Sequence, residues 1–367
     1  MRKRTGLLTL ALVLLLAGAL PVLSFAAADT NAALDYLKTQ QNADGGFGSG
    51  FSPDSAVGST ADAVLAIVSV GGDLAVFDQA GNTPLTYLAA NAPSVATGGD
   101  LAKLIMAVVA AGQNPRDFGG IDSVAALEAM IGADGTIGTE NDTFVAHTLA
   151  VLALASGQRP IPAAAVDVIK SAQQEGGTWA WDGSVETAGD TNTTSFALQA
   201  LVAAGEAADG EAVTGALAYY KSIQNEDGGW PYQSPSDFGT ATDANSTAVV
   251  IQAIIASGQD AAGADWTVAE GSTPIAALEA FQNESGAFAW QAAVPDDNLL
   301  ATVQTLPALA GNAFPIATMN VGELEATPVT APETMPETGG ATVNLVVLAL
   351  TSGLALAGSG YALRRGK

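Results

Sequence analysis

Cysteine is absent from the 367-residue chain, and histidine occurs only once. Without cysteine the chain can form no disulfide and no thiolate metal site, and it has no thiol nucleophile. Its stability must therefore come from a packed core. The sequence predicts neither a metal site nor a cofactor.

Basic side chains are also scarce, with 12 Lys and Arg against 37 Asp and Glu. Half of the basic residues lie at the two ends of the chain, whereas every acidic residue lies within residues 29–338. A segment this acidic repels the phosphates of nucleic acids and the headgroups of anionic lipids. Nucleic acid is therefore excluded as a partner.

The N-terminus has the order of features typical of a secretory signal peptide. Basic residues at positions 2–4 precede an apolar run, Leu7 to Leu20, and a stretch of alanines that ends at Ala28. An uncleaved anchor helix is the alternative, but the apolar run is short for crossing a membrane. We predict cleavage after Ala28 and export of the remaining chain.

The C-terminus carries a pentapeptide, then an apolar run at 341–363 that is long enough to span a bilayer, then basic residues. This order resembles the sorting signal of Gram-positive sortase substrates, in which Leu-Pro-x-Thr-Gly precedes a hydrophobic helix. The resemblance implies that a sortase-type transpeptidase cleaves after Thr338 and links the protein to the cell wall. A plain membrane anchor is the alternative. The pentapeptide is Met335, Pro336, Glu337, Thr338 and Gly339, with methionine in place of the usual leucine.

Residues 316–338 are rich in proline and threonine and poor in apolar residues, which is typical of an extended stalk. The predicted organisation is therefore a signal peptide at 1–28, a folded domain at 29–315, a stalk at 316–338, and a transmembrane helix with a basic tail at 339–367. The domain would stand outside the cell, anchored to the wall or the membrane.

Six apolar segments within the domain each end at a glycine: Gly71, Gly112, Gly157, Gly205, Gly258 and Gly311. In the last four segments an acidic residue stands 15 positions before the glycine: Asp142, Asp190, Asp243 and Asp296. Aspartate caps the start of a helix and a left-handed glycine ends one, so these segments are predicted to be helices of matched length. They are apolar nearly all round, which indicates buried helices.

A second set of helices, with one polar face, alternates with the first and is predicted to form an outer layer. Four of them end in a glutamine that is followed at fixed spacing by a glycine and an aromatic ring. Glutamine can bond free backbone groups, glycine permits a sharp turn, and the ring packs the corner. These residues are Gln41, Gly45 and Phe47; Gln173, Gly177 and Trp179; Gln224, Gly228 and Trp230; and Gln282, Gly286 and Phe288.

The pattern resembles the QW repeat of squalene and oxidosqualene cyclases and of protein prenyltransferase β subunits, over about residues 31–311. The resemblance implies an all-α fold, an α/α toroid in which six helical hairpins close into a ring with the apolar helices inside. Hairpins of this kind cannot bury both faces alone, so they stack in an array in any case. The corners near 84–112 and 131–137 lack the signature.

The chemistry of these families is not matched residue by residue. The Asp-x-Asp-Asp cluster that protonates an alkene in squalene-hopene cyclases is missing, and its nearest counterpart at 295–298 is explained more simply as a helix cap. The zinc site of prenyltransferases and the thioester of complement-like domains both need cysteine. The sequence therefore favours a protein without catalytic activity.

Caps and corner rings are predicted to gather at the mouth of the ring, where carboxylates and aromatic faces suit a neutral or cationic ligand or a sugar. For any one of them, capping or packing is the simpler interpretation. A hydrogen-bonded core histidine is favoured over a lumenal acid-base group for His147. The candidate ligand-binding residues are Asp142, His147, Asp190, Asp243, Asp296, Trp181, Trp230, Tyr232 and Trp290.

Three functions remain open. The main prediction is a non-catalytic ligand-binding or display module at the cell surface, similar to the cobalamin carriers, whose partner is a small molecule, a glycan or a surface ligand. The second is an enzyme that acts on an isoprenoid or a glycan in the lumen, and the third is a structural or adhesive surface protein. An aromatic-lined cavity would disfavour the third, and a plugged lumen would disfavour the first two.

Overall fold

The computed structural model describes residues 27–237 and 239–322. Most of the predicted signal peptide and stalk, the sorting pentapeptide and the C-terminal helix lie outside these residues. In the part of the chain that is described, no helix is both long and apolar enough to cross a membrane.

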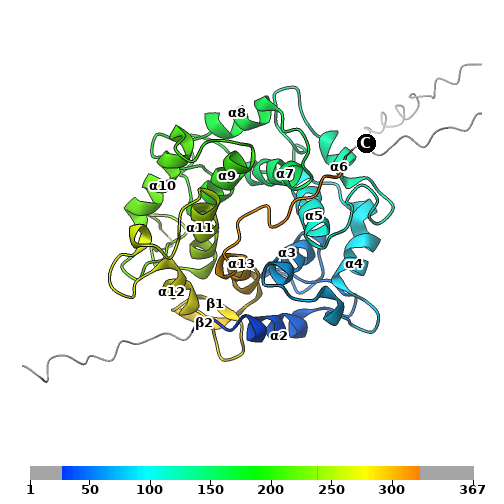
Figure 1. The fold of residues 1–367 in the computed structure, drawn as a ribbon, viewed down its shortest axis with the longest axis horizontal. Coiled ribbons are helices and arrows are strands. Elements are labelled where there is room, and N and C mark those ends of the chain that lie inside the picture. Colours follow the sequence, from blue (N-terminus) through cyan, green and yellow to red (C-terminus); the bar gives the residue numbers. More distant parts are fainter. Residues whose placement is uncertain (1–26, 238, 323–367) are drawn as a thin grey trace, which may run out of the picture. The chain divides into compact units, whose positions relative to one another are not determined.

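Twelve α-helices form two concentric layers in the described part of the chain (Figure 1). The inner layer consists of α3 (Val57–Ser69), α5 (Gly98–Ala110), α7 (Phe144–Ser156), α9 (Thr191–Ala203), α11 (Ala244–Ala256) and α13 (Leu299–Leu309). The outer layer consists of α2 (Thr30–Gln40), α4 (Pro84–Asn91), α6 (Ser123–Glu128), α8 (Ala163–Ser171), α10 (Glu211–Ile223) and α12 (Pro274–Glu279). This is the predicted α/α toroid.

Short elements connect the hairpins. Three 3₁₀ helices are η1 (Leu74–Val76), η2 (Ala92–Ser94) and η3 (Ala264–Trp266). Two strands, β1 (Phe288–Gln291) and β2 (Val294–Asn298), precede α13 in the chain and pair antiparallel, with Phe288 opposite Asn298. The sequence did not predict this hairpin, which places Trp290 in β1 and Asp296 in β2.

The glutamine of each repeat fastens its corner to the next hairpin. The Nε2 group of Gln224 donates to the carbonyl of Gly228 at 2.8 Å and to that of Trp266 at 2.9 Å. Gln41, Gln173 and Gln282 make the same pair of bonds, one within the corner and one to the following hairpin. The ring six positions after each glutamine is buried. The repeat is therefore a structural staple.

The last corner closes the ring on the first helix. Gln282 donates to the carbonyl of Asp29 at 2.8 Å, and the Asp29 amide donates back to the Gln282 side chain at 2.7 Å. Gly286 has a φ of +87°, and a β-carbon there would lie 2.2 Å from the carbonyl oxygen of Ala32. The closed arrangement therefore requires glycine at this position.

The acidic residues before the inner helices divide into two groups. Asp190 and Asp243 cap α9 and α11, each accepting a backbone N–H three residues on at 2.7 Å. Asp142 instead accepts the amides of Gly98 and Gly99 at the start of the neighbouring α5, and Asp296 lies in β2, so neither caps its own helix as predicted. Asn298 caps α13.

The predicted glycine ends hold at five of the six inner helices, where the glycine has a positive φ. Gly157 is the exception, because it is right-handed and the next residue, Gln158, adopts a φ of +51° instead. The amide of Val321 donates to the Gly157 carbonyl at 3.3 Å, so a crossing segment occupies this helix end.

That segment, residues 312–322 after α13, is called the strap below. It crosses the ring at the C-terminal ends of the inner helices (Figure 1). Asn312 donates to the Ser69 carbonyl at 3.0 Å, the Ser156 hydroxyl donates to the Ala317 carbonyl at 2.9 Å, and the Met319 amide donates to the Ser156 carbonyl at 2.8 Å. Residues 316–322, assigned to the stalk from composition, thus pack on the ring.

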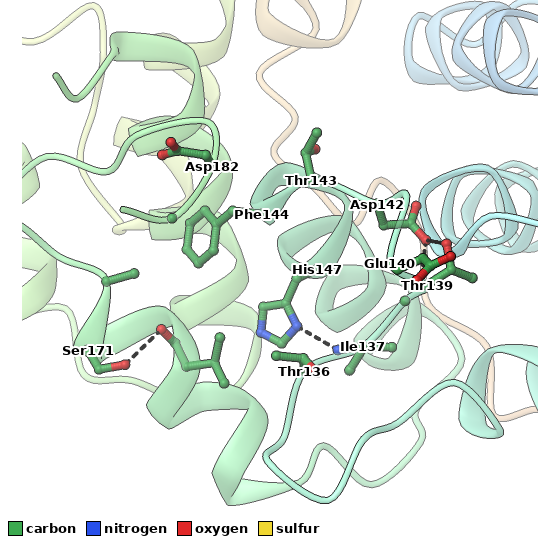
Figure 2. A pocket seen from close by; sticks show the side chains of 14 residues that line it. Thr136, Ile137, Thr139, Glu140, Asp142, Thr143, Phe144, His147, Ser171 and Asp182 are labelled. Carbon is green, nitrogen blue, oxygen red and sulfur yellow. Dashed lines mark hydrogen bonds between the residues drawn. The ribbon is translucent and has the colours of Figure 1, made fainter. Parts of the chain in front are cut away.

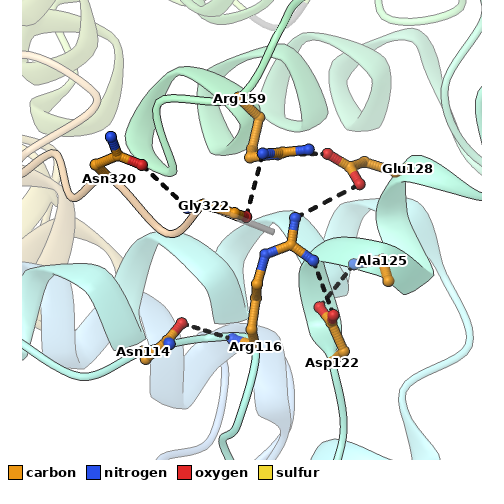
Figure 3. Close-up of polar contacts among 8 residues, drawn as sticks. All are labelled: Asn114, Arg116, Asp122, Ala125, Glu128, Arg159, Asn320 and Gly322. Carbon is orange, nitrogen blue, oxygen red and sulfur yellow. Dashed lines mark hydrogen bonds and ion pairs between the residues drawn. The ribbon is translucent and has the colours of Figure 1, made fainter. Parts of the chain in front are cut away.

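A charge cluster with a buried arginine at its centre holds the end of the strap (Figure 3). Arg159 donates to the Gly322 carbonyl at 3.1 Å and pairs with Glu128 at 2.6 Å. Arg116, whose side chain is 5% exposed, pairs with Asp122 at 2.8 Å and lies 3.8 Å from Glu128. Loss of the partners of Arg116 would be costly, since a lone charge would remain in the interior.

Candidate functional site

Three adjoining cavities open from the end of the ring opposite the strap, where the inner helices begin. The mouth cavity has a volume of about 340 Å³, the side cavity about 150 Å³ and the deep chamber about 50 Å³. They adjoin because they share lining residues: Phe51 and Leu300 line the first two, Asp62 and Lys103 the last two, and Gln304 the mouth and the chamber. Together they form a cup inside the ring.

The polarity of the cup changes with depth. The mouth cavity is lined by amides and a carboxyl, from Asn192, Asp243, Asn245, Asn298 and Gln304. One helical turn beyond Asp62, Lys103 and Gln304 the wall is apolar, because the next residues on these faces are Leu65, Met106 and Pro307. The other residues of the chamber are Leu149, Phe196, Val249, Gln252, Val303 and Phe314. The cup therefore suits an amphiphilic ligand.

Asp243 is the buried carboxyl of the mouth, with 2% of its surface exposed. Burial raises its pKa to about 6, although hydrogen bonds from the Ser246 amide and hydroxyl and from the amides of Tyr232 and Asn245 oppose the shift. A carboxyl with this pKa holds a proton over part of the mildly acidic range, so it can act as a general acid.

Asp190 lies in the equivalent position on α9, and Tyr232 connects the two carboxyls. The Tyr232 hydroxyl donates to Asp190 and its amide donates to Asp243. Burial also raises the pKa of Asp190, and burial together with the Asp190 charge raises the pKa of Tyr232 to about 12. Asp190 is not among the residues that line the mouth cavity, whereas Asp243 and Tyr232 are.

Aromatic rings stand at the mouth. Phe51 is 93% exposed, Tyr232 42% and Trp290 41%, and all three line the mouth cavity. Trp181, 53% exposed, occupies the repeat position of Tyr232 and Trp290 but does not line the cavity. Trp230, a candidate ligand residue from the sequence, is fully buried, and its indole donates to the Tyr220 carbonyl at 2.8 Å. It belongs to the wall and not to the site.

Lys103 and Asp62 form an ion pair at 2.7 Å halfway down the cup. Burial alone would lower the pKa of Lys103, but the charge and hydrogen bond of Asp62, with a contribution from Asp100, outweigh burial and raise it. Lysine therefore stays protonated and paired, and the site gains no free cation from it. The pair marks the boundary between the polar mouth and the apolar chamber.

Two amide oxygens of the cup lack a hydrogen-bond donor within the described residues. They are Oε1 of Gln252 and Oδ1 of Asn192. Gln252, which is 1% exposed, lines the deep chamber, and Asn192 lines the mouth cavity. A buried acceptor without a donor is costly, so a buried water molecule is expected beside each.

A separate cavity of about 560 Å³ lies outside the lumen beside α7 and α8, and His147 and Asp142 line it (Figure 2). His147 Nδ1 accepts the Ile137 amide at 3.0 Å, and Nε2 lies 3.0 Å from the Ala165 carbonyl. Both ring nitrogens are thus engaged, and burial lowers the pKa of the ring. His147 is a hydrogen-bonded core residue.

The repeat explains why a histidine stands there. At four other corners the backbone amide of the corner aromatic residue donates to the hydroxyl of a threonine. This threonine is the fourth residue of the inner helix: Thr60, Thr194, Thr247 and Thr302. His147 is the fourth residue of α7 and accepts the same amide. The second nitrogen of His147 lies beside a carbonyl of the next hairpin, the contact that glutamine makes at the other corners. Glutamine is missing at this corner, where Ile131 takes its place.

Asp142 in the same outer cavity is equally occupied. It accepts the amides of Gly98, Gly99 and Thr139 and the Thr139 hydroxyl. Burial would raise its pKa, but these bonds outweigh burial and lower it. No group of three or more potential metal ligands occurs in residues 27–237 and 239–322. The outer cavity thus presents a structural carboxylate and a structural histidine.

Sequence reasoning missed several residues of the cup. Phe51, Lys103, Gln252, Gln304 and Phe314 were not candidates. The inner helices are apolar nearly all round, so the sequence does not show which face points to the lumen. A signal was nevertheless present, since Asp62, Lys103, Gln252 and Gln304 are isolated polar residues in otherwise apolar helices.

Comparison with known proteins assigns the fold. Residues 125–295 match the family model of the squalene-hopene cyclase C-terminal domain, and residues 7–89 match that of the prenyltransferase alpha-alpha toroid domain. No curated protein matches the chain in sequence. The chain is thus an α/α toroid with squalene cyclase-like and prenyltransferase-like segments.

Solved structures share this fold. The type II terpene cyclase MstE from Scytonema, in an apo form, has a TM-score of 0.55 and 14% identity, covering 77% of this chain and 95% of the other. Its complexes with geranylgeranyl dihydroxybenzoate as substrate and merosterolic acid A as product have TM-scores of 0.54. A protein from Actinoplanes has a TM-score of 0.50 and 15% identity, covering 77% of this chain and 97% of the other.

These similarities correct the functional prediction. The sequence favoured a non-catalytic ligand-binding or display module, but the structures with TM-scores of 0.54 and 0.55 are those of a type II terpene cyclase, including complexes with its substrate and with its product. The prediction failed because it relied on the missing Asp-x-Asp-Asp tetrapeptide. A buried acid can also come from a helix cap such as Asp243, which no short motif marks.

Proposed function

We propose that the chain is an enzyme that carries out acid-catalysed chemistry on an isoprenoid bound in the cup of the toroid. The observation that carries the proposal is Asp243, a buried carboxyl with a pKa of about 6 in a cavity lined by aromatic rings. A protonated carboxyl is the proton donor that an alkene needs, and aromatic faces stabilise a nearby cation.

The substrate class follows from the shape of the cup. The apolar deep chamber accepts a hydrocarbon, whereas the amides of Asn192, Asn245 and Gln304 at the mouth can bond a polar group. The substrate bound by the similar cyclase MstE, geranylgeranyl dihydroxybenzoate, fits the same description. The strap closes the far end of the lumen, so the mouth is the route for binding.

The proposed reaction is an isomerisation that needs no co-reactant. Asp243 donates its proton to a double bond held at the mouth, and a tertiary carbocation forms. A second double bond attacks the cation, which makes a carbon–carbon bond and moves the charge. Loss of a proton from a neighbouring carbon to the Asp243 carboxylate or to water ends the sequence. The product is an isomer of the substrate, and the faces of Tyr232 and Trp290 stand where the charge develops.

A glycan-acting enzyme is the second candidate. The observation that favours it is the exposure of Tyr232 and Trp290 beside side-chain amides, because sugar rings stack on exposed aromatic faces. The apolar floor of the cup favours the isoprenoid over the glycan, since a sugar would leave its hydroxyls without partners there.

The location of the enzyme is part of the proposal. The basic and apolar N-terminus supports export, and the pentapeptide followed by an apolar run supports anchoring through a sortase-type transpeptidase or directly in the membrane. Fractionation of cells with and without a sortase would distinguish wall-linked from membrane-retained protein.

The test is a product assay. The purified chain is incubated at pH 5 to 7 with geranylgeraniol, farnesol and their aromatic esters, and in parallel with oligosaccharides, and products are identified by mass spectrometry. Isomeric cyclised products should form with the wild type, and Asp243→Asn should slow their formation by about 10²- to 10⁴-fold, as expected for loss of a general acid. Asp296→Asn, on the exposed β2 strand, is the matched control. Turnover of oligosaccharides alone would contradict the isoprenoid assignment.

A further inference from the structure

The strap contributes one side chain, Phe314, to the wall of the deep chamber, and the other lining residues come from the inner helices. Phe314 lines the deep chamber together with Phe196 of α9 and Pro307 of α13. Its ring stacks on Phe196 with 6.4 Å between centroids and 24° between planes. Its amide donates to the Gln199 side chain at 2.8 Å, which fixes the backbone of the strap under the lumen.

The strap is fastened on both sides of Phe314. Asn312 bonds the end of α3 and Ala317, Met319 and Val321 bond the end of α7, so the backbone is held independently of the Phe314 side chain. A smaller side chain at this position would therefore deepen the chamber without releasing the strap. Phe314 is only partly buried, which indicates that the strap is a single layer beneath the chamber.

The present depth of the cup is small. The chamber of about 50 Å³ holds only the end of a hydrocarbon chain, whereas the mouth cavity of about 340 Å³ holds the larger part of a ligand. The other apolar wall residues of the chamber come from inner helices whose backbones are fixed by the corner staples. The Phe314 ring is the wall element whose size can change with the least disturbance of the ring.

We propose that Phe314 is the specificity-determining residue that sets the length of the hydrocarbon chain the cup accepts. This inference rests on the proposed function, because it takes the ligand to be an isoprenoid with its tail towards the floor. Replacing Phe314 with a smaller residue lengthens the accepted chain, and replacing it with a larger one shortens it.

The experiment measures binding and not turnover. Dissociation constants of the full-length chain for geraniol, farnesol and geranylgeraniol are obtained from quenching of tryptophan fluorescence, with native mass spectrometry to confirm stoichiometry. The variants are Phe314→Leu, Phe314→Ala and Phe314→Trp. Ile316→Ala, a strap residue that does not line the chamber, is the control for loosening of the strap.

The expected result is a shift of the preferred alcohol towards the longer chain, by one isoprene unit in Phe314→Ala and by less in Phe314→Leu, and towards the shorter chain in Phe314→Trp, with Ile316→Ala unchanged. An unchanged order of affinities across the Phe314 variants would overturn the inference, as would a failure of all three alcohols to bind. If the preference shifts but the wild type forms no product in the product assay described above, the acid-catalysed reaction is refuted and the role of Phe314 stands.

Discussion

Replacement of Asp243 by asparagine tests the central group of the site through stability alone, with no substrate needed. Asparagine is as good a helix cap as aspartate, so it can still accept the Ser246 amide at the start of α11. The substitution therefore removes the titratable proton and keeps the cap. What changes is the dependence of the unfolding free energy on pH.

The sign follows from the direction of the shift. The pKa of Asp243 is raised from 3.8 to about 6 in the folded chain, so between these values the folded state binds more protons than the unfolded state. Stability from this group is complete below pH 3.8 and is lost as the pH rises through about 6. A shift of about two units corresponds to a loss of about 3 kcal/mol at 1.36 kcal/mol per unit.

The assay is urea unfolding of wild type and Asp243→Asn at pH 4 and at pH 7.5, followed by circular dichroism. The difference in unfolding free energy between the two proteins should change by about 2.4 kcal/mol between the two pH values, in favour of the variant at the higher pH, because at pH 4 part of the unfolded-state carboxyl is already ionised. Groups that the substitution does not touch, such as His147, cancel in this comparison. A difference that stays constant within about 1 kcal/mol would show that Asp243 ionises as an ordinary cap, and it could then not hold the proton that catalysis requires.

Four further outcomes are expected. In a denaturant titration, Gly286→Ala should lower the unfolding free energy by about 2 kcal/mol or more, the cost of a left-handed residue plus a backbone collision. An unchanged unfolding free energy would contradict the contact that closes the ring. Gln224→Ala should cost about 1 to 3 kcal/mol in the same assay, because two carbonyls lose their donor. His147→Thr should cost a similar amount, and adding Ile131→Gln should restore most of it by rebuilding the standard corner; no recovery would refute the equivalence. The rate of product formation should rise as the pH falls through about 6, and a rate that falls there would exclude Asp243 as the acid.

The ring could be predicted because its determinants repeat. Each glutamine, glycine and ring triplet makes the same bonds, so the spacing in the sequence indicates the hairpin directly. The packing of residues 316–322 could not be predicted, because Ala317, Met319 and Val321 contact the ring through backbone groups and a stretch rich in proline and threonine has the composition of a stalk. The sequence predicted that Asp142 caps a helix, but not that it caps the neighbouring helix α5. That choice depends on the distance between neighbouring helices, which no local pattern encodes.

The distribution of caps also explains why the chemistry would lie on one side of the mouth. Among the six inner helices, α3 begins after Ala56, α5 and α7 after threonines, and α13 after Asn298; only α9 and α11 begin after carboxyls. These two helices are neighbours, and Tyr232 bonds both acids. Burial raises the pKa of both carboxyls, so a proton is retained more readily there than at an exposed cap. Asp243 is the member of the pair that reaches the cavity.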